Sequence, residues 1–253
     1  MTAPCTPHVS SELKGFTRFH APGDLMHTGD LGVVCWLFGA VFWELIYDGP
    51  LAGTIGHRLD QLFALIQSVY DELATTSRLG QLKRSMFERA GQFPCLSAKA
   101  AEARHLVPVM AIILERLDSG SDRDGHRHAA AKALCDMYEI FYAHGRCLPA
   151  GAADRAVACV NAFFEHNTWL MRHATDNARL LYHMVTKTHM LFHIADLSRW
   201  MNPRYIWCYS SEAFMKDVVS AARSSIASTP KHLLGSKVVQ QSLLAIDLII
   251  GEI

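Results

Sequence analysis

Histidine is the residue type in this sequence with the widest range of possible chemistry, since 14 of the 253 residues are histidines. His189 and His193 are four residues apart, so they share one face if their segment is helical. Two imidazoles at this spacing can bind zinc, but a zinc site needs a third and usually a fourth ligand. Asp196 is a candidate third ligand, although the pair lacks the glutamate of an HExxH motif. Packing of these histidines against their own helix is the favoured interpretation, and metal binding is the alternative.

A second polar cluster, Asp24, His27 and Asp30, precedes the most apolar run of the chain. Carboxylates are favoured at helix N-termini, where they accept hydrogen bonds from unpaired backbone N–H groups. The stretch from Gly29 to Gly32 lacks the glycine spacing and the lysine of a phosphate-binding loop. Without further context, this cluster predicts the start of a helix.

The third group of polar and aromatic residues surrounds a break between two predicted helices at Asn202-Pro203. Junctions between helices often carry functional groups. The structural alternative is that the aromatic residues belong to the core and that Glu212 offsets a helix dipole. The residues of this group are Lys187, His189, His193, Arg204, Trp207, Tyr209, Glu212, Lys216 and Arg223.

The composition predicts a folded chain, because 50% of the residues are hydrophobic and only 19% are charged. The formal net charge is zero, whereas proteins that coat nucleic acid non-specifically are normally basic. Any contact with DNA must therefore come from a local basic face.

Cysteine usage and hydropathy indicate an intracellular protein without a membrane span. The seven cysteines form no CxxC pair, and the N-terminal residues 1–14 lack the apolar core of a signal peptide. The most apolar run, 31–47, is interrupted by Gly32, Gly39 and Glu44 and is shorter than the roughly 20 residues needed to cross a bilayer. We expect it to be a buried central helix.

Apolar residues recur at helical spacing along most of the chain, and the pattern predicts an all-α fold of about nine helices with at most one or two short strands. Residues 205–209 are the segment with β composition. We expect an irregular lead-in over 1–23 and a single helical domain over 24–253. The predicted helices are 31–47, 54–75, 79–89, 97–117, 129–143, 152–173, 176–200, 210–228 and 230–250.

Taken together, the second and third polar groups resemble two segments of CACTA-type DDE transposases. The stretch Asp24-Leu-Met-His27 is similar to the DxMH segment of that family. The later stretch is similar to the family's KxHxLxH helix, its Asn-Pro turn, its Trp-x-Tyr and the glutamate that follows. The resemblance extends over roughly sixty residues and is loose elsewhere. It implies that the chain corresponds to the helical insertion region of an RNase H-like transposase.

The resemblance also assigns roles to residues. It implies that Glu212 is the late catalytic acid and that Asp24 is a partial or vestigial one, the two being the expected metal ligands. It makes His27, His189, His193 and Trp207 supporting residues and Lys187, Arg204, Lys216 and Arg223 contacts to DNA. In the family, acidic residues hold two Mg²⁺ ions that activate water or a DNA 3′-hydroxyl.

The departures from the family are as informative as the matches. The early catalytic aspartates have no counterpart in this sequence, and Ala213 and Asp217 make the late helix less basic. Asp24 and Glu212 alone cannot hold two metal ions. We expect the isolated chain to be inactive in strand transfer, with Mg²⁺ bound only if the missing catalytic part is supplied.

Three hypotheses follow, in order of preference. The first is a transposase-derived helical fragment that binds DNA, which would place it in the nucleus. The second is a non-catalytic helical module that binds protein and has no nucleic-acid role. The third is a metal-dependent hydrolase that uses the histidines. None of the three involves a membrane.

Overall fold

The computed structural model describes residues 23–226, 231–233, 235–237 and 239–240, and the predicted lead-in and most of the segment 230–250 lie outside these ranges. All regular elements of the described part are helical, which confirms the all-α prediction. No strand occurs there, and the segment 205–209 contains the end of a short 3₁₀ turn, η5 (Pro203–Tyr205), and the start of a helix. The chain divides into two compact units, one ending at Ile206 and the other beginning at Trp207.

The core of the first unit is one long apolar helix. A π-helix, η3 (Met26–Val34), continues directly into α1 (Cys35–Tyr47), so the helix begins earlier than predicted and ends where expected. Over its 22 residues it is long and apolar enough to cross a membrane, but 83% of its most apolar window is buried inside the fold. Burial by the surrounding helices, rather than insufficient length, therefore identifies it as a core helix.

The N-terminus of this helix is capped by Asp24. Its Oδ1 accepts the backbone N–H of Met26 at 3.2 Å and its Oδ2 accepts that of His27 at 3.0 Å. The Nδ1 atom of His27 also lies against Oδ2. The predicted capping role is confirmed, because these N–H groups have no partner inside the helix.

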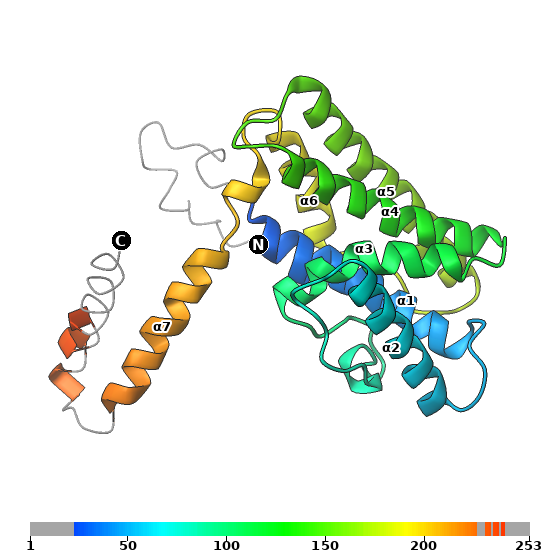
Figure 1. Ribbon diagram of the computed structural model, residues 1–253, viewed down its shortest axis with the longest axis horizontal. Coiled ribbons are helices and arrows are strands. Elements are labelled where there is room, and N and C mark those ends of the chain that lie inside the picture. The colour runs from blue at the N-terminus through cyan, green and yellow to red at the C-terminus, as the bar shows by residue number, and fades with distance from the viewer. Residues whose placement is uncertain (1–22, 227–230, 234, 238, 241–253) are drawn as a thin grey trace, which may run out of the picture. The chain divides into compact units, whose positions relative to one another are not determined.

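Five helices surround the central one (Figure 1). Helices α4 and α5 pack side by side, α3 lies against α4 and the π-helix, and α6 lies against the π-helix and α5. The second unit contains α7 and the 3₁₀ turn η6. The bounds are α2 (Ile55–Glu72), α3 (Ala100–Arg116), α4 (Asp122–Ala143), α5 (Ala150–Asp176), α6 (Thr186–Leu197), α7 (Tyr209–Ile226) and η6 (Lys231–Leu233).

The predicted helix over 79–89 was wrong, since only the 3₁₀ turn η4 (Arg84–Met86) forms there. Backbone groups on either side of that turn are instead bonded to distant elements. The Leu79 N–H donates to the Tyr70 hydroxyl at 3.2 Å, and the Leu96 N–H donates to the Cys35 carbonyl at 2.8 Å. Tertiary hydrogen bonds thus override a local helical pattern in this segment.

Two other boundaries differ from the prediction. Helix α6 begins at Thr186, and within the preceding irregular stretch Ala178 and Tyr182 have φ angles of +55° and +56°, which a right-handed helix excludes. Helix α4 begins at Asp122, seven residues before the predicted start at 129, because the Ser121 hydroxyl accepts the Asp124 N–H at 3.2 Å.

Asn202 lies at the predicted break between two helices and is fully buried. Its hydrogen bonds connect the end of the first unit to the end of α4. Its side-chain amide donates to the carbonyls of Phe141, His144 and Gly145 at 2.8, 3.1 and 3.0 Å. Its own N–H donates to the Arg146 carbonyl at 2.8 Å. One side chain therefore pairs with a carbonyl in the last turn of α4 and with two carbonyls just beyond its end.

Candidate functional site

Two segments that resemble transposase motifs lie in the first unit, and the structure places them side by side. They are the segment with Asp24 and His27 and helix α6. A Cβ added to Gly32 would meet the Lys187 Cδ at 2.7 Å, and one added to Gly23 would meet the Ile194 Cγ1 at 3.2 Å. Helix α6 therefore runs along the first turns of the central helix, next to the segment that carries Asp24 and His27.

The predicted histidine pair is formed on the exposed side of α6. The Nε2 atoms of His189 and His193 are 3.0 Å apart, and their ring centroids are separated by 4.6 Å at nearly a right angle. Two imidazole nitrogens at this distance share a hydrogen bond only if at least one ring is neutral. Lys187, on the same helix, is exposed.

The remaining predicted site residues lie at or beyond the junction of the units. Arg204, in the first unit, places its guanidinium 4.5 Å from the centre of the Tyr142 ring. In the second unit, Trp207 makes an edge contact with Tyr209, with ring centroids 5.1 Å apart. Glu212, Lys216 and Arg223 are exposed on α7. Because Asp24 and Glu212 belong to different units, their convergence on a metal ion stays a prediction.

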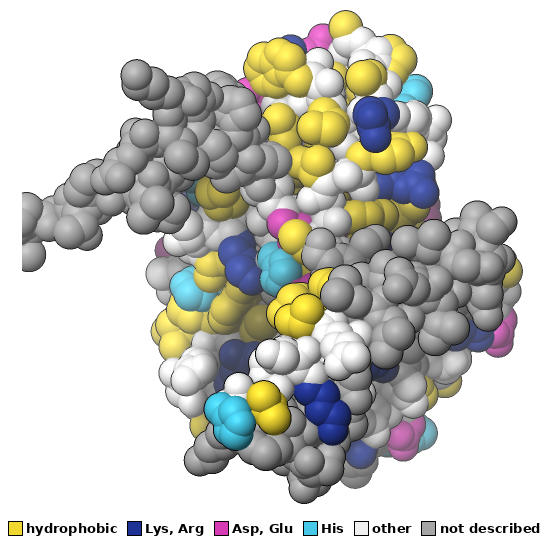
Figure 2. Space-filling view, turned by 90° about the vertical axis from the view of Figure 1, so that its left-hand side faces the viewer, with side chains coloured by type: hydrophobic (Ala, Val, Ile, Leu, Met, Phe, Trp, Pro, Cys, Tyr) yellow, Lys and Arg dark blue, Asp and Glu magenta, His cyan; other side chains and the backbone are white. Residues whose placement is uncertain are grey.

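Figure 2 shows lysine and arginine side chains scattered among hydrophobic and histidine side chains on one face of the molecule.

Two carboxylates that the sequence analysis named are buried inside the central helix instead of playing the roles expected of them. Asp30 was grouped with Asp24 at the start of a helix, which was wrong for Asp30, and Glu44 was treated only as an interruption of an apolar run. Asp30 is fully buried, and its Oδ1 accepts a hydrogen bond from the Tyr138 hydroxyl of α4. The neighbouring Gly29 makes this contact possible, because a Cβ there would come within 2.7 Å of the Tyr138 oxygen. The π-helical turn thus presents a buried acid to a phenol on another helix, and π-helical turns occur frequently at functional sites.

The second carboxylate, Glu44, belongs to a buried charge network at the other end of the central helix. Glu44 and Arg127 are each only 2% exposed, and the Arg127 Nη1 lies 3.4 Å from Glu44 Oε2. Arg127 also donates to Asp124, while the Tyr182 hydroxyl donates to Glu44. Helix α4 is therefore held against both ends of the central helix by polar contacts, which fixes its register.

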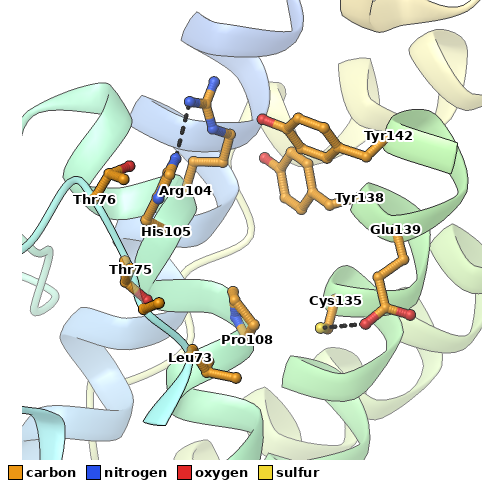
Figure 3. Close-up of a pocket in the computed structure, with 11 residues that line it drawn as sticks. Leu73, Thr75, Thr76, Arg104, His105, Pro108, Cys135, Tyr138, Glu139 and Tyr142 are labelled. Atoms are coloured by element: carbon orange, nitrogen blue, oxygen red, sulfur yellow. Dashed lines mark hydrogen bonds between the residues drawn. The ribbon is translucent and has the colours of Figure 1, made fainter. Parts of the chain in front are cut away.

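A pocket of about 420 Å³ lies between the end of α2, α3 and α4 (Figure 3). It is within the size range of small-molecule sites, and its lining is mostly apolar with a few polar groups, as is typical of them. The lining residues are Leu73, Ala74, Thr75, Thr76, Arg104, His105, Pro108, Cys135, Tyr138, Glu139 and Tyr142.

One end of the pocket carries a cation next to an imidazole. A guanidinium nitrogen of Arg104 lies 3.2 Å from Nε2 of His105, and Figure 3 marks this contact. Burial, and then the charge of Arg104, lower the pKa of His105, so the imidazole is mostly neutral at pH 7. Since Arg104 can only donate, Nε2 is the acceptor and Nδ1 carries the ring proton.

The opposite part of the pocket carries a cysteine beside a carboxylate. Burial, followed by the charge of Glu139, raises the pKa of the Cys135 thiol to about 12. The thiol lies 3.5 Å from a Glu139 carboxylate oxygen and stays protonated at neutral pH. Because the thiolate is the reactive form of cysteine, this thiol is a poor nucleophile.

The α4 residues of the pocket carry a signal that the sequence does contain. Cys135, Tyr138, Glu139 and Tyr142 follow the i, i+3, i+4, i+7 spacing of one helix face. This face mixes aromatic and polar side chains, which a search for apolar periodicity passes over. The contribution of α2 and α3 to the pocket has no comparable sequence signature.

The comparisons with known proteins identify no relative. No protein-family model, curated protein or solved structure matches the chain. The transposase resemblance therefore rests on the sequence motifs alone, and the site has to be interpreted from its own geometry.

Proposed function

We propose that the first unit is a non-catalytic helical domain that binds a small, mostly apolar carboxylate in the pocket between α2, α3 and α4. The observation that carries this proposal is the pocket itself, in which apolar and aromatic walls carry a cation and a neutral imidazole at one end and the Glu139 carboxylate at the opposite end. An apolar body would be desolvated against Leu73, Pro108 and the tyrosine rings. A carboxylate would pair with Arg104 and accept a hydrogen bond from His105 Nδ1.

The wall formed by the end of α2 is held in place by Arg78. This side chain donates to the Thr75 carbonyl at 2.7 Å and to the Tyr70 carbonyl at 3.2 Å, and it is paired with Asp71. Ala74 is held within this turn at a φ of +48°, a conformation that non-glycine residues rarely adopt. A wall fixed in this way loses little conformational entropy when a ligand binds.

The proposal is tested with two matched probes, 2-naphthoate and its uncharged analogue 2-naphthalenemethanol, in calorimetric titrations. Wild-type protein is expected to bind the carboxylate at least tenfold more tightly, because hydrogen bonds to charged groups contribute about 1.5–3 kcal/mol. Arg104→Met should abolish this preference. Cys135→Phe, which fills the pocket, should weaken binding of both probes.

Arg155→Met is the matched control, because Arg155 is an exposed arginine on α5 outside this pocket. It should bind both probes like the wild type, and circular dichroism should show the same helix content in all variants. Equal binding of the two probes by the wild type would contradict the anionic specificity. If a folded Cys135→Phe variant bound both probes as tightly as the wild type, the pocket would be excluded as their binding site.

The transposase-derived role is the second candidate, supported by the proximity of α6 to the Asp24 segment. If it holds, the full chain should be retained on duplex DNA at low salt, and its affinity should fall as salt rises. Lys216→Met and Arg223→Met should each reduce the slope of log affinity against log salt by about one unit. Absence of salt-dependent retention would instead favour the alternative of a helical protein-interaction module without a nucleic-acid role.

A further inference from the structure

A pair of histidines outside the pocket connects α4 to α5. His126 and His166 are 40 residues apart in sequence, and their Nδ1 atoms lie 2.9 Å from each other. Both side chains are partly exposed, so they can be reached from solvent. Unlike the pair on α6, these histidines come from two helices and can meet only in the folded protein.

The orientation of the His126 ring is fixed by aromatic stacking. It lies on Trp169 with ring centroids 4.0 Å apart and planes at 12°. Trp169 stacks in turn on His173, at 5.0 Å and 7°. The Nδ1 atom of His126 is thus held toward His166 by contacts that do not involve the histidine pair.

Two acidic residues lie near the pair on the same two helices. They are Asp122 on α4 and Glu165 on α5, and both are exposed. Asp122 lies four residues before His126 and therefore on the same face of α4.

We infer that His126 and His166 form a binding site for a divalent transition-metal ion of the zinc, cobalt, nickel and copper class, which joins α4 to α5. Imidazole nitrogens are ligands that these ions bind well. Tetrahedral zinc with Zn–N bonds of about 2.0–2.1 Å requires a nitrogen–nitrogen distance of roughly 3.3 Å. The rings need to separate only slightly to reach it. A third ligand would come from Asp122 or Glu165 after rotation of its side chain toward the pair, and water would complete the coordination.

The test uses tag-free protein carrying His189→Gln and His193→Gln, so that the pair on α6 cannot bind the metal. Zn²⁺ is titrated by calorimetry, and Co²⁺ is followed through the visible absorption that tetrahedral coordination makes intense. One Zn²⁺ should bind per chain. Adding His166→Gln should weaken the affinity at least tenfold, whereas His173→Gln, which removes only a stacking partner of Trp169, should change it less than threefold.

Thermal unfolding gives a second readout that does not depend on the titration. Saturating Zn²⁺ should raise the unfolding temperature of the background variant, and a chelator should reverse the increase, because the ion binds a geometry that exists only in the folded chain. The His166→Gln variant should show a smaller increase at the same Zn²⁺ concentration. No Zn²⁺ binding below 1 mM by the background variant, or equal affinity with and without His166, would overturn the inference and leave the pair as a hydrogen bond between two imidazoles.

Discussion

Arg127→Met is expected to lower the free energy of unfolding at pH 7 by about 3–5 kcal/mol, the cost typical of removing one partner from a buried ion pair. Arg127 is the cation that contacts both Glu44 and Asp124, which are 2% and 6% exposed. Methionine keeps most of the side-chain volume but leaves two buried carboxylates without this partner. Urea unfolding followed by circular dichroism measures the change.

The dependence of this loss on pH distinguishes an electrostatic effect from a packing effect. Burial raises the pKa of the Asp124 carboxyl, but hydrogen bonds from Ser119 and the charge of Arg127 outweigh it, and the pKa lies below its ordinary value. A depressed carboxyl pKa stabilises the fold above the pKa of the unfolded chain and ceases to do so as the pH falls through the folded value. The part of this difference that comes from Asp124 should therefore persist from pH 7 to about pH 4 and shrink only as the pH falls below about 4.

Two further variants control this prediction. Arg127→Met combined with Glu44→Gln removes one buried charge and keeps a side-chain oxygen that can accept from Tyr182, so it should recover at least 1 kcal/mol relative to Arg127→Met alone. Arg116→Met breaks an exposed ion pair with Glu72 and should cost no more than about 1 kcal/mol. Similar losses for Arg127→Met and Arg116→Met would contradict the assignment of Arg127 as a buried structural cation.

Gly39→Ala is expected to lower the free energy of unfolding by about 2–3 kcal/mol, even though alanine is the better helix former by about 1 kcal/mol. A Cβ at this position would lie 2.6 Å from the Cα and 2.7 Å from the N of Cys95, and 2.8 Å from the N of Leu96. These are backbone atoms of a segment that crosses directly over α1. The added methyl group must displace that segment and weaken the bond from Leu96 to the Cys35 carbonyl.

Gly125→Ala is the matched control for this substitution. Gly125 also lies within a helix, but a Cβ there would meet no atom within 4 Å. It should therefore stabilise the protein by about 0.5–1 kcal/mol through helix propensity alone. If thermal and urea unfolding showed Gly39→Ala to be as stable as wild type, the close approach of the two segments would not exist as described.

Local patterns were sufficient to predict most helices. Apolar spacing placed α2, α3 and α5 to within a few residues, and the central helix ends at Tyr47, where the predicted range 31–47 ended. Pro108 lies inside α3 without ending it. These features follow from contacts between residues three or four apart and from the backbone limits of proline and glycine, which the sequence states directly.

The candidate sites were much less predictable. Glu44 was treated as an interruption of an apolar run, yet its contacts with Arg127 and Tyr182, 83 and 138 residues away, are what make its burial tolerable. The same applies to the pairing of Asp30 with Tyr138 across 108 residues. The sequence did contain one signal for these contacts, which is an acidic residue within a predicted core helix. Because a buried charge requires a partner, such a residue indicates that a partner exists on another element. The sequence does not say which residue that partner is.

The sequence by itself determined that this chain is helical, where most helices begin and end, and that its most apolar segment is buried, because each of these properties depends on neighbours along the chain. Tertiary structure decided which polar groups meet. The pocket beneath Arg104, the charge network around Arg127 and the pairing of His126 with His166 each join helices that are separate in sequence. The distances within these groups are set by how whole helices pack against one another. Helix packing is the sum of many weak contacts, and no short sequence motif encodes it.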